Sequence, residues 1–392
     1  MAKKTKKRKQ TRKLVKNNSG VWWFFLVCTV LSALYALIMS GMTVAWWQLK
    51  KPCPVMQPQT MVSVVVAVRN ESANIAKLLE CLKKQDYPSH LWELIVVDDH
   101  SQDNTAELVK AFMGQMPLRV LQQVAHEKGK KAALQKGVSE AKGDLILTTD
   151  GDCMLQKGWL STMVASFERE EPHLISGPVC FEKTNSFFGK ILTVEFASLV
   201  GIGAAAMALK RPFICNGANL GFRKSVFQEV EGYTGNVHIA SGDDEFLLRK
   251  IKQLPKAKIL FVKDYAALVQ TRAPHTLGVF FQQRLRWASK WRLGLDIHTM
   301  STAIFVFVIH FCRIVMLGGL FWTQIQTFCA TLLCLQMALD ILFVGSVLKF
   351  FKKQQLWWYL IPTLGFYSFY AVFFGLVANR KHYDWKGRRI QI

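Results

Sequence analysis

Two aspartates, Asp150 and Asp152, follow a short apolar run at 144–149. An apolar strand that ends in Asp-Gly-Asp brings two carboxylates close together, which is costly unless a cation neutralises them. A lone Asp-x-Asp in a loop is usually just solvated, but this one closes a strand. Because Mg²⁺ and Mn²⁺ prefer oxygen ligands, the motif predicts a site for Mg²⁺ or Mn²⁺ that stabilises the charge of a diphosphate.

A second acidic pair, Asp98 and Asp99, follows an apolar run at 94–97, and Glu71 follows another at 61–68. Ligands of parallel α/β sheets bind beyond the carboxyl ends of the strands. Carboxylates there can accept hydrogen bonds from a base imide or from ribose hydroxyls, so these residues are candidates for nucleotide binding. Asp98 or Asp99 is equally suited to capping the helix that follows.

Three consecutive carboxylates, Asp243, Asp244 and Glu245, precede a helical run. Negative charge there also complements the dipole of a helix. A carboxylate in this cluster can also act as a general base that takes a proton from a hydroxyl.

Two basic motifs accompany the carboxylates. Lys130 follows Gly129 at a helix start, where backbone amides and an ammonium suit a phosphate or a ribose hydroxyl. A solvated helix start is the alternative. Gln283, Arg286 and Trp287 form a Gln-x-x-Arg-Trp motif, in which Arg286 can pair with a diphosphate and Trp287 can stack on a sugar. An interfacial helix with ordinary basic and aromatic anchors is the alternative here.

Alternating strands and helices must position these motifs. Short β-branched runs are expected to be strands at 61–68, 94–97, 118–122 and 144–149. Amphipathic stretches between them are expected to be helices at 73–84, 103–112 and 130–141. This alternation predicts an α/β fold with a mostly parallel sheet covered by helices. The acidic motifs fall at the carboxyl ends of its strands.

The order of these motifs along residues 61–291 resembles that of family 2 glycosyltransferases. The resemblance is to the membrane-bound synthases, whose relatives include cellulose, chitin and hyaluronan synthases and ceramide glucosyltransferase. It implies a GT-A-like domain that binds a nucleotide-sugar donor. The same resemblance implies roles for the motif residues: Asp99 at the base with Asp98 and Glu71 in support, the metal on Asp150 and Asp152, chiefly Asp152, and Asp244 as the catalytic base beside Asp243.

Hydrophobic segments flank the predicted catalytic domain. The run at 21–47 is long enough to cross a bilayer and has tryptophans at both ends. The run at 191–209 is interrupted by Glu195, so a core or cleft-lining helix is expected there. The predicted organisation is a basic tail at 1–20, an anchor at 21–47, a linker at 48–60, the catalytic domain at 61–275, an interfacial helix at 276–300, three transmembrane helices at 301–378 and a basic tail at 379–392.

Charge and cysteine content narrow the partners. The chain has 50 Lys and Arg against 27 Asp and Glu, and the surplus concentrates in the two tails, which suit an anionic membrane surface. Nucleic-acid binding is not expected, because no recognition motif accompanies the charge. The scattered cysteines suit a reducing compartment. We expect an integral protein of the cytoplasmic (inner) membrane with its catalytic domain in the cytoplasm; the sequence leaves the oligomeric state open.

The count of spans conflicts with the basic tails. One span before the domain and three after it would put both tails outside, against the positive-inside tendency. One apolar segment is therefore expected to lie in the interface or to re-enter, or the anchor fails to cross fully. His310, Arg313 and Asp340 lie within the C-terminal spans and are expected either near the acceptor or near the interface.

The sequence thus predicts an inverting, metal-dependent glycosyltransferase that acts on a membrane lipid or glycan acceptor. A processive polysaccharide synthase is the alternative of the same class, although the few predicted spans offer little material for a channel. A non-catalytic nucleotide-sugar-binding scaffold or a transporter is the alternative of another class. The motif set disfavours a scaffold, because none of the expected carboxylates is missing.

Overall fold

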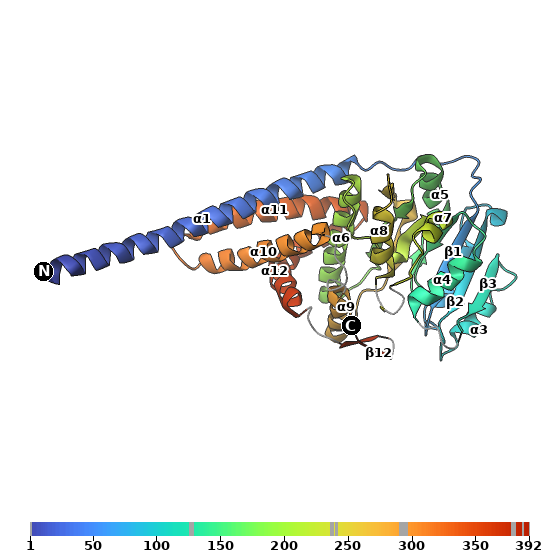
Figure 1. The fold of residues 1–392 in the computed structure, drawn as a ribbon. Helices are drawn as coiled ribbons and strands as arrows, with labels where there is room; N and C mark the ends of the chain where they lie inside the picture. The colour runs from blue at the N-terminus through green and yellow to red at the C-terminus, as the bar shows by residue number, and fades with distance from the viewer. Residues whose placement is uncertain are drawn as a thin grey trace.

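The computed structural model shows an α/β domain from which long helices project (Figure 1). It describes residues 2–124, 129–235, 239, 242–289, 297–377, 382–385 and 388–391. Side chains of 2–21 and of the last two short strands are outside this description. Four residues close to the motifs in sequence also lie outside it, namely Glu127, Lys128, Ser241 and Trp291.

A seven-stranded sheet forms the centre of the described α/β domain, in the order β3-β2-β1-β4-β8-β6-β9. Its strands are β1 Val62–Val68, β2 Trp92–Asp98, β3 Leu118–Gln122, β4 Leu145–Thr148, β6 Leu174–Ser176, β8 Leu220–Arg223 and β9 Ile259–Phe261. Only β8 among these runs antiparallel to its neighbours. The predicted α/β fold with a mostly parallel sheet is confirmed.

Helices cover both faces of the sheet, which is why β1 and β2 are almost continuously apolar and buried. The helices of this domain are α2 Ile75–Lys83, α3 Thr105–Lys110, α4 Lys130–Glu140, α5 Trp159–Glu170, α7 Lys224–Glu229 and α8 Asp243–Lys252, with short 3₁₀ turns η1 Ser89–Leu91, η2 Gly217–Asn219 and η3 Tyr265–Ala267. In α2 the apolar residues Ile75, Leu78, Leu79 and Leu82 share one face and are fully buried.

Strand register places the ends of β1, β2 and β4 side by side. Val68 pairs with Asp98, and Val65 pairs with Thr148. Gly143 lets β4 begin against β1, since a Cβ atom there would lie 2.5 Å from the backbone nitrogen of Ser63. A second, three-stranded sheet of β5 Met154–Leu155, β7 Val179–Phe181 and β10 Val269–Thr271 lies beside the same edge. Residues that follow β1, β2 and β4 are thereby brought together.

Among the described residues, five helices are long and apolar enough to cross a membrane. They are α1 Ala2–Gln48, α6 Phe187–Ala208, α10 Ile297–Gly319, α11 Gln326–Phe350 and α12 Leu360–Val377, the last preceded by η5 Gln354–Tyr359. Figure 1 shows α1, α10 and α11 projecting away from the sheet, whereas α6 runs across them next to the domain. Helix α9 Leu277–Ser289 and strands β11 His382–Trp385 and β12 Arg388–Gln391 complete the described elements.

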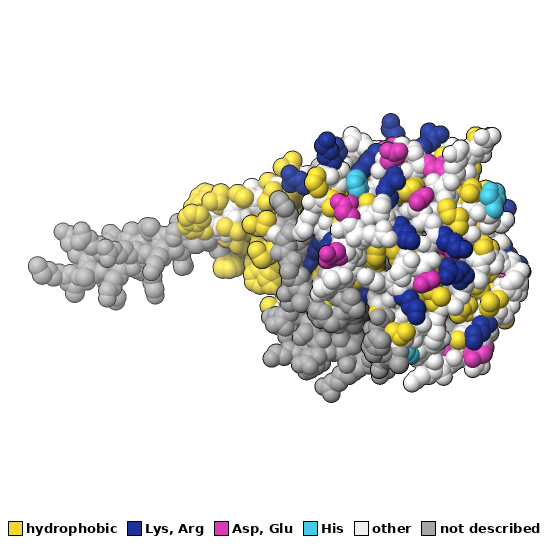
Figure 2. Space-filling model, turned by 45° about the vertical axis from the view of Figure 1, so that its right-hand side comes forward, with side chains coloured by type: hydrophobic (Ala, Val, Ile, Leu, Met, Phe, Trp, Pro, Cys, Tyr) yellow, Lys and Arg dark blue, Asp and Glu magenta, His cyan; other side chains and the backbone are white. Residues whose placement is uncertain are grey.

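Surface composition follows this division. Figure 2 shows apolar side chains over the described part of the projecting helices and mixed charged side chains over the α/β domain. The exposed faces of the helices carry large apolar residues such as Leu37, Phe311 and Phe366. A patch of this extent on a soluble protein would be costly, so the helices are suited to lipid.

A buried polar cluster joins α1, α10 and α11. Arg313 forms an ion pair of 2.9 Å with Asp340 and donates from Nε to Gln336 at 2.6 Å, and Tyr35 donates to Asp340. His310 lies 3.1 Å from the hydroxyl of Ser368 on α12. Helix packing gives these side chains partners inside the bundle, where an unpaired charge would be costly. That His310, Arg313 and Asp340 lie near the acceptor or the interface stays a prediction.

Candidate active site

The Asp-Gly-Asp motif lies where β4 ends. Asp150 and Asp152 both line a cavity, and Thr271 of β10 donates to Oδ2 of Asp152 at 3.3 Å. Lys130, at the start of α4, also reaches this point: its Nζ lies 2.6 Å from Oδ1 of Asp150 and 2.9 Å from Oδ2 of Asp243. Two predicted acidic motifs and the predicted basic helix start therefore meet at one ammonium group.

The charge of Lys130 is fixed by these neighbours. Burial alone would disfavour an ammonium, but the carboxylates of Asp150 and Asp243 outweigh it and raise the pKa of Lys130 well above its usual value. Lys130 is therefore a cation at neutral pH. The alternative of a solvated helix start does not hold, because the Lys130 side chain is only 21% exposed.

The acidic cluster at the start of α8 reaches the site through η2. Antiparallel pairing of β8 with β4 places Gly217, just before β8, beside Thr148, whose hydroxyl donates to the carbonyl of Gly217 at 3.1 Å. The amide of Gly217 donates to Oδ2 of Asp244 at 3.0 Å, and that of Glu245 donates to Oδ1 at 2.8 Å. These bonds hold the Asp244 carboxylate at the edge of the cavity.

The residues expected to bind the nucleotide lie at the same sheet edge and contact the segments that carry Lys130 and Asp150. Asp99 is buried and accepts the amide of Gly129, next to Lys130, at 3.1 Å. Asp98 is also buried and accepts from Nε2 of Gln122 on β3 at 2.9 Å. Glu71 contacts the Asp-Gly-Asp turn, since a Cβ atom on Gly151 would lie 3.0 Å from its Cγ.

Neither Asp98 nor Asp99 caps α3, the helix that follows. Its N-cap is Asn104, with no side-chain capping bond, and Asp103 instead accepts from the amide and the hydroxyl of Thr105 in the first turn. The capping alternative for Asp98 and Asp99 is therefore wrong. Their roles toward a nucleotide remain predictions.

Helix α9 carries the Gln-x-x-Arg-Trp motif along one wall of the cavity, which Gln283, Arg286 and Trp287 all line. Oε1 of Gln283 is buried and has no hydrogen-bond partner among the described residues. The guanidinium of Arg284 lies 4.1 Å from the centre of the Trp287 ring. One face of that ring is thus already covered, and its predicted contact with a sugar needs the other face or an edge.

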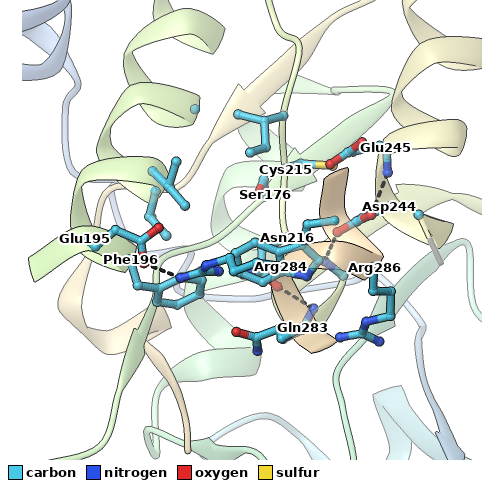
Figure 3. Close-up of a pocket in the computed structure, with 18 of the residues that line it drawn as sticks. Ser176, Glu195, Phe196, Cys215, Asn216, Asp244, Glu245, Gln283, Arg284 and Arg286 are labelled. Atoms are coloured by element: carbon cyan, nitrogen blue, oxygen red, sulfur yellow. Dashed lines mark hydrogen bonds and ion pairs between the residues drawn. The ribbon is translucent and has the colours of Figure 1, made fainter. Parts of the chain in front are cut away.

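Arg284 and Glu195 are two residues of the site that were not predicted from the sequence. Arg284 is 2% exposed and forms an ion pair with Glu195 of α6, which also accepts from the hydroxyl of Tyr370 at 3.4 Å. The interruption of an apolar run by Glu195 was the visible signal, but its partner lies 89 positions away. Figure 3 shows Asp244 and Glu245 at one side of the cavity, Glu195 and Phe196 at the other, and the α9 side chains between them.

The cavity has a volume of about 630 Å³, enough for a ligand of substrate size. Its acidic end is formed by Asp150, Asp152, Asp243 and Asp244. Its other end is lined by α6, α10 and α12. Helix α6 therefore lines the cleft, as expected from the sequence, and the cavity runs from the sheet edge to the helices suited to lipid.

The residues present fit a divalent cation. Asp150 and Asp152 present carboxylate oxygens to one cavity, and Mg²⁺ or Mn²⁺ commonly takes one or two carboxylates and completes its shell with water and phosphate oxygens. No group of three or more acidic, histidine or cysteine side chains of metal-binding geometry occurs among the described residues, so a site here would rely on such added ligands. Asp152 and Asp150 would hold the ion.

Comparisons with known proteins agree with this geometry. Residues 63–231 match the family model described as glycosyl transferase family 2. A poly-beta-1,6-N-acetyl-D-glucosamine synthase of Staphylococcus epidermidis is 27% identical over 236 residues, which cover 58% of this chain and 53% of the relative. Glycosyltransferase AglE of Haloferax volcanii is 29% identical over 183 residues, covering 47% of this chain and 58% of the relative. The chain thus spans about half the length of these relatives.

The fold is also that of a solved glycosyltransferase. A mannosyltransferase from Pyrobaculum calidifontis, solved in complex with GDP-Man and Mn²⁺, superposes with a TM-score of 0.56 at 16% identity, covering 91% of this chain and 99% of that one. The α/β domain therefore has a GT-A-like fold. Residues 63–231 are similar to glycosyl transferase family 2, and the apolar helices fit the membrane-bound synthase type.

Proposed function

We propose that the chain is an inverting glycosyltransferase that moves a sugar from a nucleotide-sugar donor to a hydroxyl of a membrane-bound acceptor. The observation that carries the proposal is the single cavity whose acidic end gathers Asp150, Asp152 and Asp244 and whose other end is lined by α6, α10 and α12. A donor diphosphate and a membrane acceptor can meet only where such a cavity joins the sheet edge to the bilayer.

Each group of motif residues has its own role in the proposed reaction. A divalent cation bound by Asp150 and Asp152 would neutralise the departing diphosphate. Asp244 takes the proton of the acceptor hydroxyl as its oxygen attacks the anomeric carbon and the bond from that carbon to the diphosphate oxygen breaks. Arg286 lines the cavity and would pair with diphosphate oxygens, and Lys130 balances the carboxylates.

The donor is tested by thermal shift of the purified full-length chain in detergent. Nucleotide sugars with uracil or guanine bases are screened with and without Mn²⁺, because binding to the folded state raises the melting temperature. We expect at least one donor to stabilise the protein, and to do so only with Mn²⁺. No stabilisation by any donor, together with no release of nucleoside diphosphate, would remove the proposal.

A processive polysaccharide synthase is the second candidate. It is favoured by the similarity to poly-beta-1,6-N-acetyl-D-glucosamine synthase, although that match covers about half of the relative. Product length distinguishes the two: a single-addition enzyme yields one labelled sugar per acceptor, whereas a synthase yields a ladder. The cavity of about 630 Å³ is of the size of one substrate, so we expect one addition.

The proposed location is the cytoplasmic membrane, with the α/β domain on the cytoplasmic side where nucleotide sugars are made. Both ends of α12 lie beside elements next to the domain: the Tyr359 ring just before it contacts Phe187 of α6, and Phe374 contacts Phe280 and Phe281 of α9. We propose that α12 lies obliquely at the interface rather than crossing. The C-terminal basic tail would then be cytoplasmic, in line with the positive-inside tendency, whereas the N-terminal basic tail would still lie outside against it.

The remaining helices α1, α10 and α11 would cross, which places the start of α1 on the far side. Protease access to tags at each terminus in spheroplasts tests this arrangement. We expect an accessible N-terminal tag and a protected C-terminal tag. Accessibility of both would show that α12 crosses the membrane.

A further inference from the structure

The lipid-facing end of the cavity differs in chemistry from its acidic end. It is walled by side chains of three helices: Phe196 of α6, Ala303, Val306 and Phe307 of α10, and Tyr370 and Phe374 of α12. The same helices expose apolar residues outward, including Ile304, Phe311 and Phe369. The wall is therefore continuous with a surface suited to acyl chains, which a water-soluble glycan would not need.

Arg284 stands between this apolar wall and the acidic end. It is 2% exposed, lines the cavity, and holds its pair with Glu195 through Nη2. Its Nε and Nη1 are buried and have no hydrogen-bond partner among the described residues. Buried donors without a partner are costly, so the two N–H groups of this cavity-lining residue point to a ligand that supplies oxygen acceptors.

The charge of the lining selects the type of head group. Glu195 already neutralises Arg284. The described lining as a whole contains six carboxylates against four cations, so it does not favour an added anion beyond the donor diphosphate. An uncharged head group with hydroxyl oxygens can accept from Arg284 and also present a hydroxyl to Asp244. A phosphate head group would add negative charge to a lining that already has more carboxylates than cations.

We infer that the acceptor is an uncharged lipid bearing hydroxyl groups, whose chains lie against α6, α10 and α12 and whose head-group oxygens accept hydrogen bonds from Nε and Nη1 of Arg284. This inference rests on the proposed function and narrows its acceptor. Arg284 is the binding residue for the head group, and Glu195 fixes the orientation of its guanidinium. Gly375 allows α10 to approach α12 at this point, since a Cβ atom there would lie 2.8 Å from the Phe307 ring.

Acceptor choice is the first test, made with the purified full-length chain in nanodiscs. The donor is the nucleotide sugar found by thermal shift, and the acceptors are dioleoylglycerol, monoglucosyl dioleoylglycerol, undecaprenyl phosphate and cellotetraose. We expect transfer to at least one of the two uncharged lipids. Preferential transfer to undecaprenyl phosphate or cellotetraose would overturn the inference, as would donor hydrolysis without transfer to either uncharged lipid.

The second test is Arg284→Lys, which keeps the charge beside Glu195 but lacks the planar set of donors. We expect the KM for the lipid acceptor to rise at least 10-fold, by a larger factor than kcat falls, with donor affinity within 2-fold of that of the unchanged chain. Arg223→Lys is the matched control, because Arg223 also stacks on a ring, that of Phe167 at 4.4 Å, but does not line the cavity.

An unchanged KM in Arg284→Lys would overturn the inference while leaving the proposed function intact. Absence of donor hydrolysis and of donor binding in the unchanged chain would instead contradict the proposed function itself. If Arg284→Lys lost donor hydrolysis as well, Arg284 would act on the donor or on folding, and the head-group role would be wrong.

Discussion

Lys130 forms ion pairs with Asp150 and Asp243, which belong to two different acidic motifs. Replacing Lys130 therefore gives a quantitative test of the site. The change Lys130→Met leaves Asp150 and Asp243 without the ammonium that lies 2.6 and 2.9 Å from them. Breaking a fully buried pair costs about 3–5 kcal/mol, and exposed pairs contribute about 0–1 kcal/mol. With side chains 21%, 37% and 14% exposed, the three groups lie between these limits.

We therefore expect the free energy of unfolding of the α/β domain to fall by about 1–3 kcal/mol, a value between those limits. For a domain of this size each kcal/mol lowers the melting temperature by about 2–4 °C, so a decrease of roughly 2–12 °C is expected. Thermal unfolding of the donor-free chain measures it. Lys136→Met, also on α4, is the matched control, because Nζ of Lys136 donates to the carbonyl of Gln122 and Lys136 does not line the cavity.

Two further results follow for Lys130→Met. Mn²⁺ should raise the melting temperature of the variant more than that of the unchanged chain, since an added cation replaces the missing charge. The raised pKa of Lys130 means that its contribution is fully present below the unfolded pKa and is lost only as the pH rises through the higher folded pKa. The difference between the two proteins should therefore be constant from pH 6 to pH 9. A variant as stable as Lys136→Met would refute this reasoning.

Three other substitutions test separate parts of the structure. Gly143→Ala places a Cβ atom against the β1 backbone and should destabilise the domain by about 1–3 kcal/mol in denaturant unfolding; unchanged stability would show that β1 and β4 are not so close. Asp152→Asn should weaken Mn²⁺-dependent donor binding at least 10-fold in titrations, and retained Mn²⁺ dependence would remove Asp152 from the metal site. Asp340→Asn leaves Arg313 unpaired in the bundle and should cost about 3–5 kcal/mol, whereas the double variant Arg313→Met with Asp340→Leu should cost less; equal losses would mean that the pair is not buried.

Local patterns were enough to predict the first half of the domain. β-branched runs gave the strands that became β1, β2, β3 and β4, and the apolar spacing of Ile75, Leu78 and Leu82 gave α2. Because parallel strands end at one edge, the meeting of the acidic motifs could also be expected. Contacts such as Gly129 with Asp99 and Lys130 with Asp150 agree with that expectation.

Contacts that depend on distant segments could not be predicted in this way. The reversed strand β8 places Gly217 against Asp244, but nothing in the local pattern of residues 217–223 states its direction. In the sequence, Arg284 resembles a surface cation of an amphipathic helix. Only the packing of α6 against α9 shows that it pairs with Glu195. The burial of both residues is a property of tertiary packing, which overrides local pattern.

The central claim is that Asp244 is the base of a glycosyl transfer at the edge of the sheet. Asp244→Asn removes the basic carboxylate, but an amide side chain can still accept one of the two backbone N–H bonds that hold it. Labelled-sugar transfer by the full-length chain, measured beside donor binding, is the direct test. We predict that transfer falls by about 10²–10⁴-fold while donor affinity stays within 2-fold, and transfer at the rate of the unchanged chain would contradict the account.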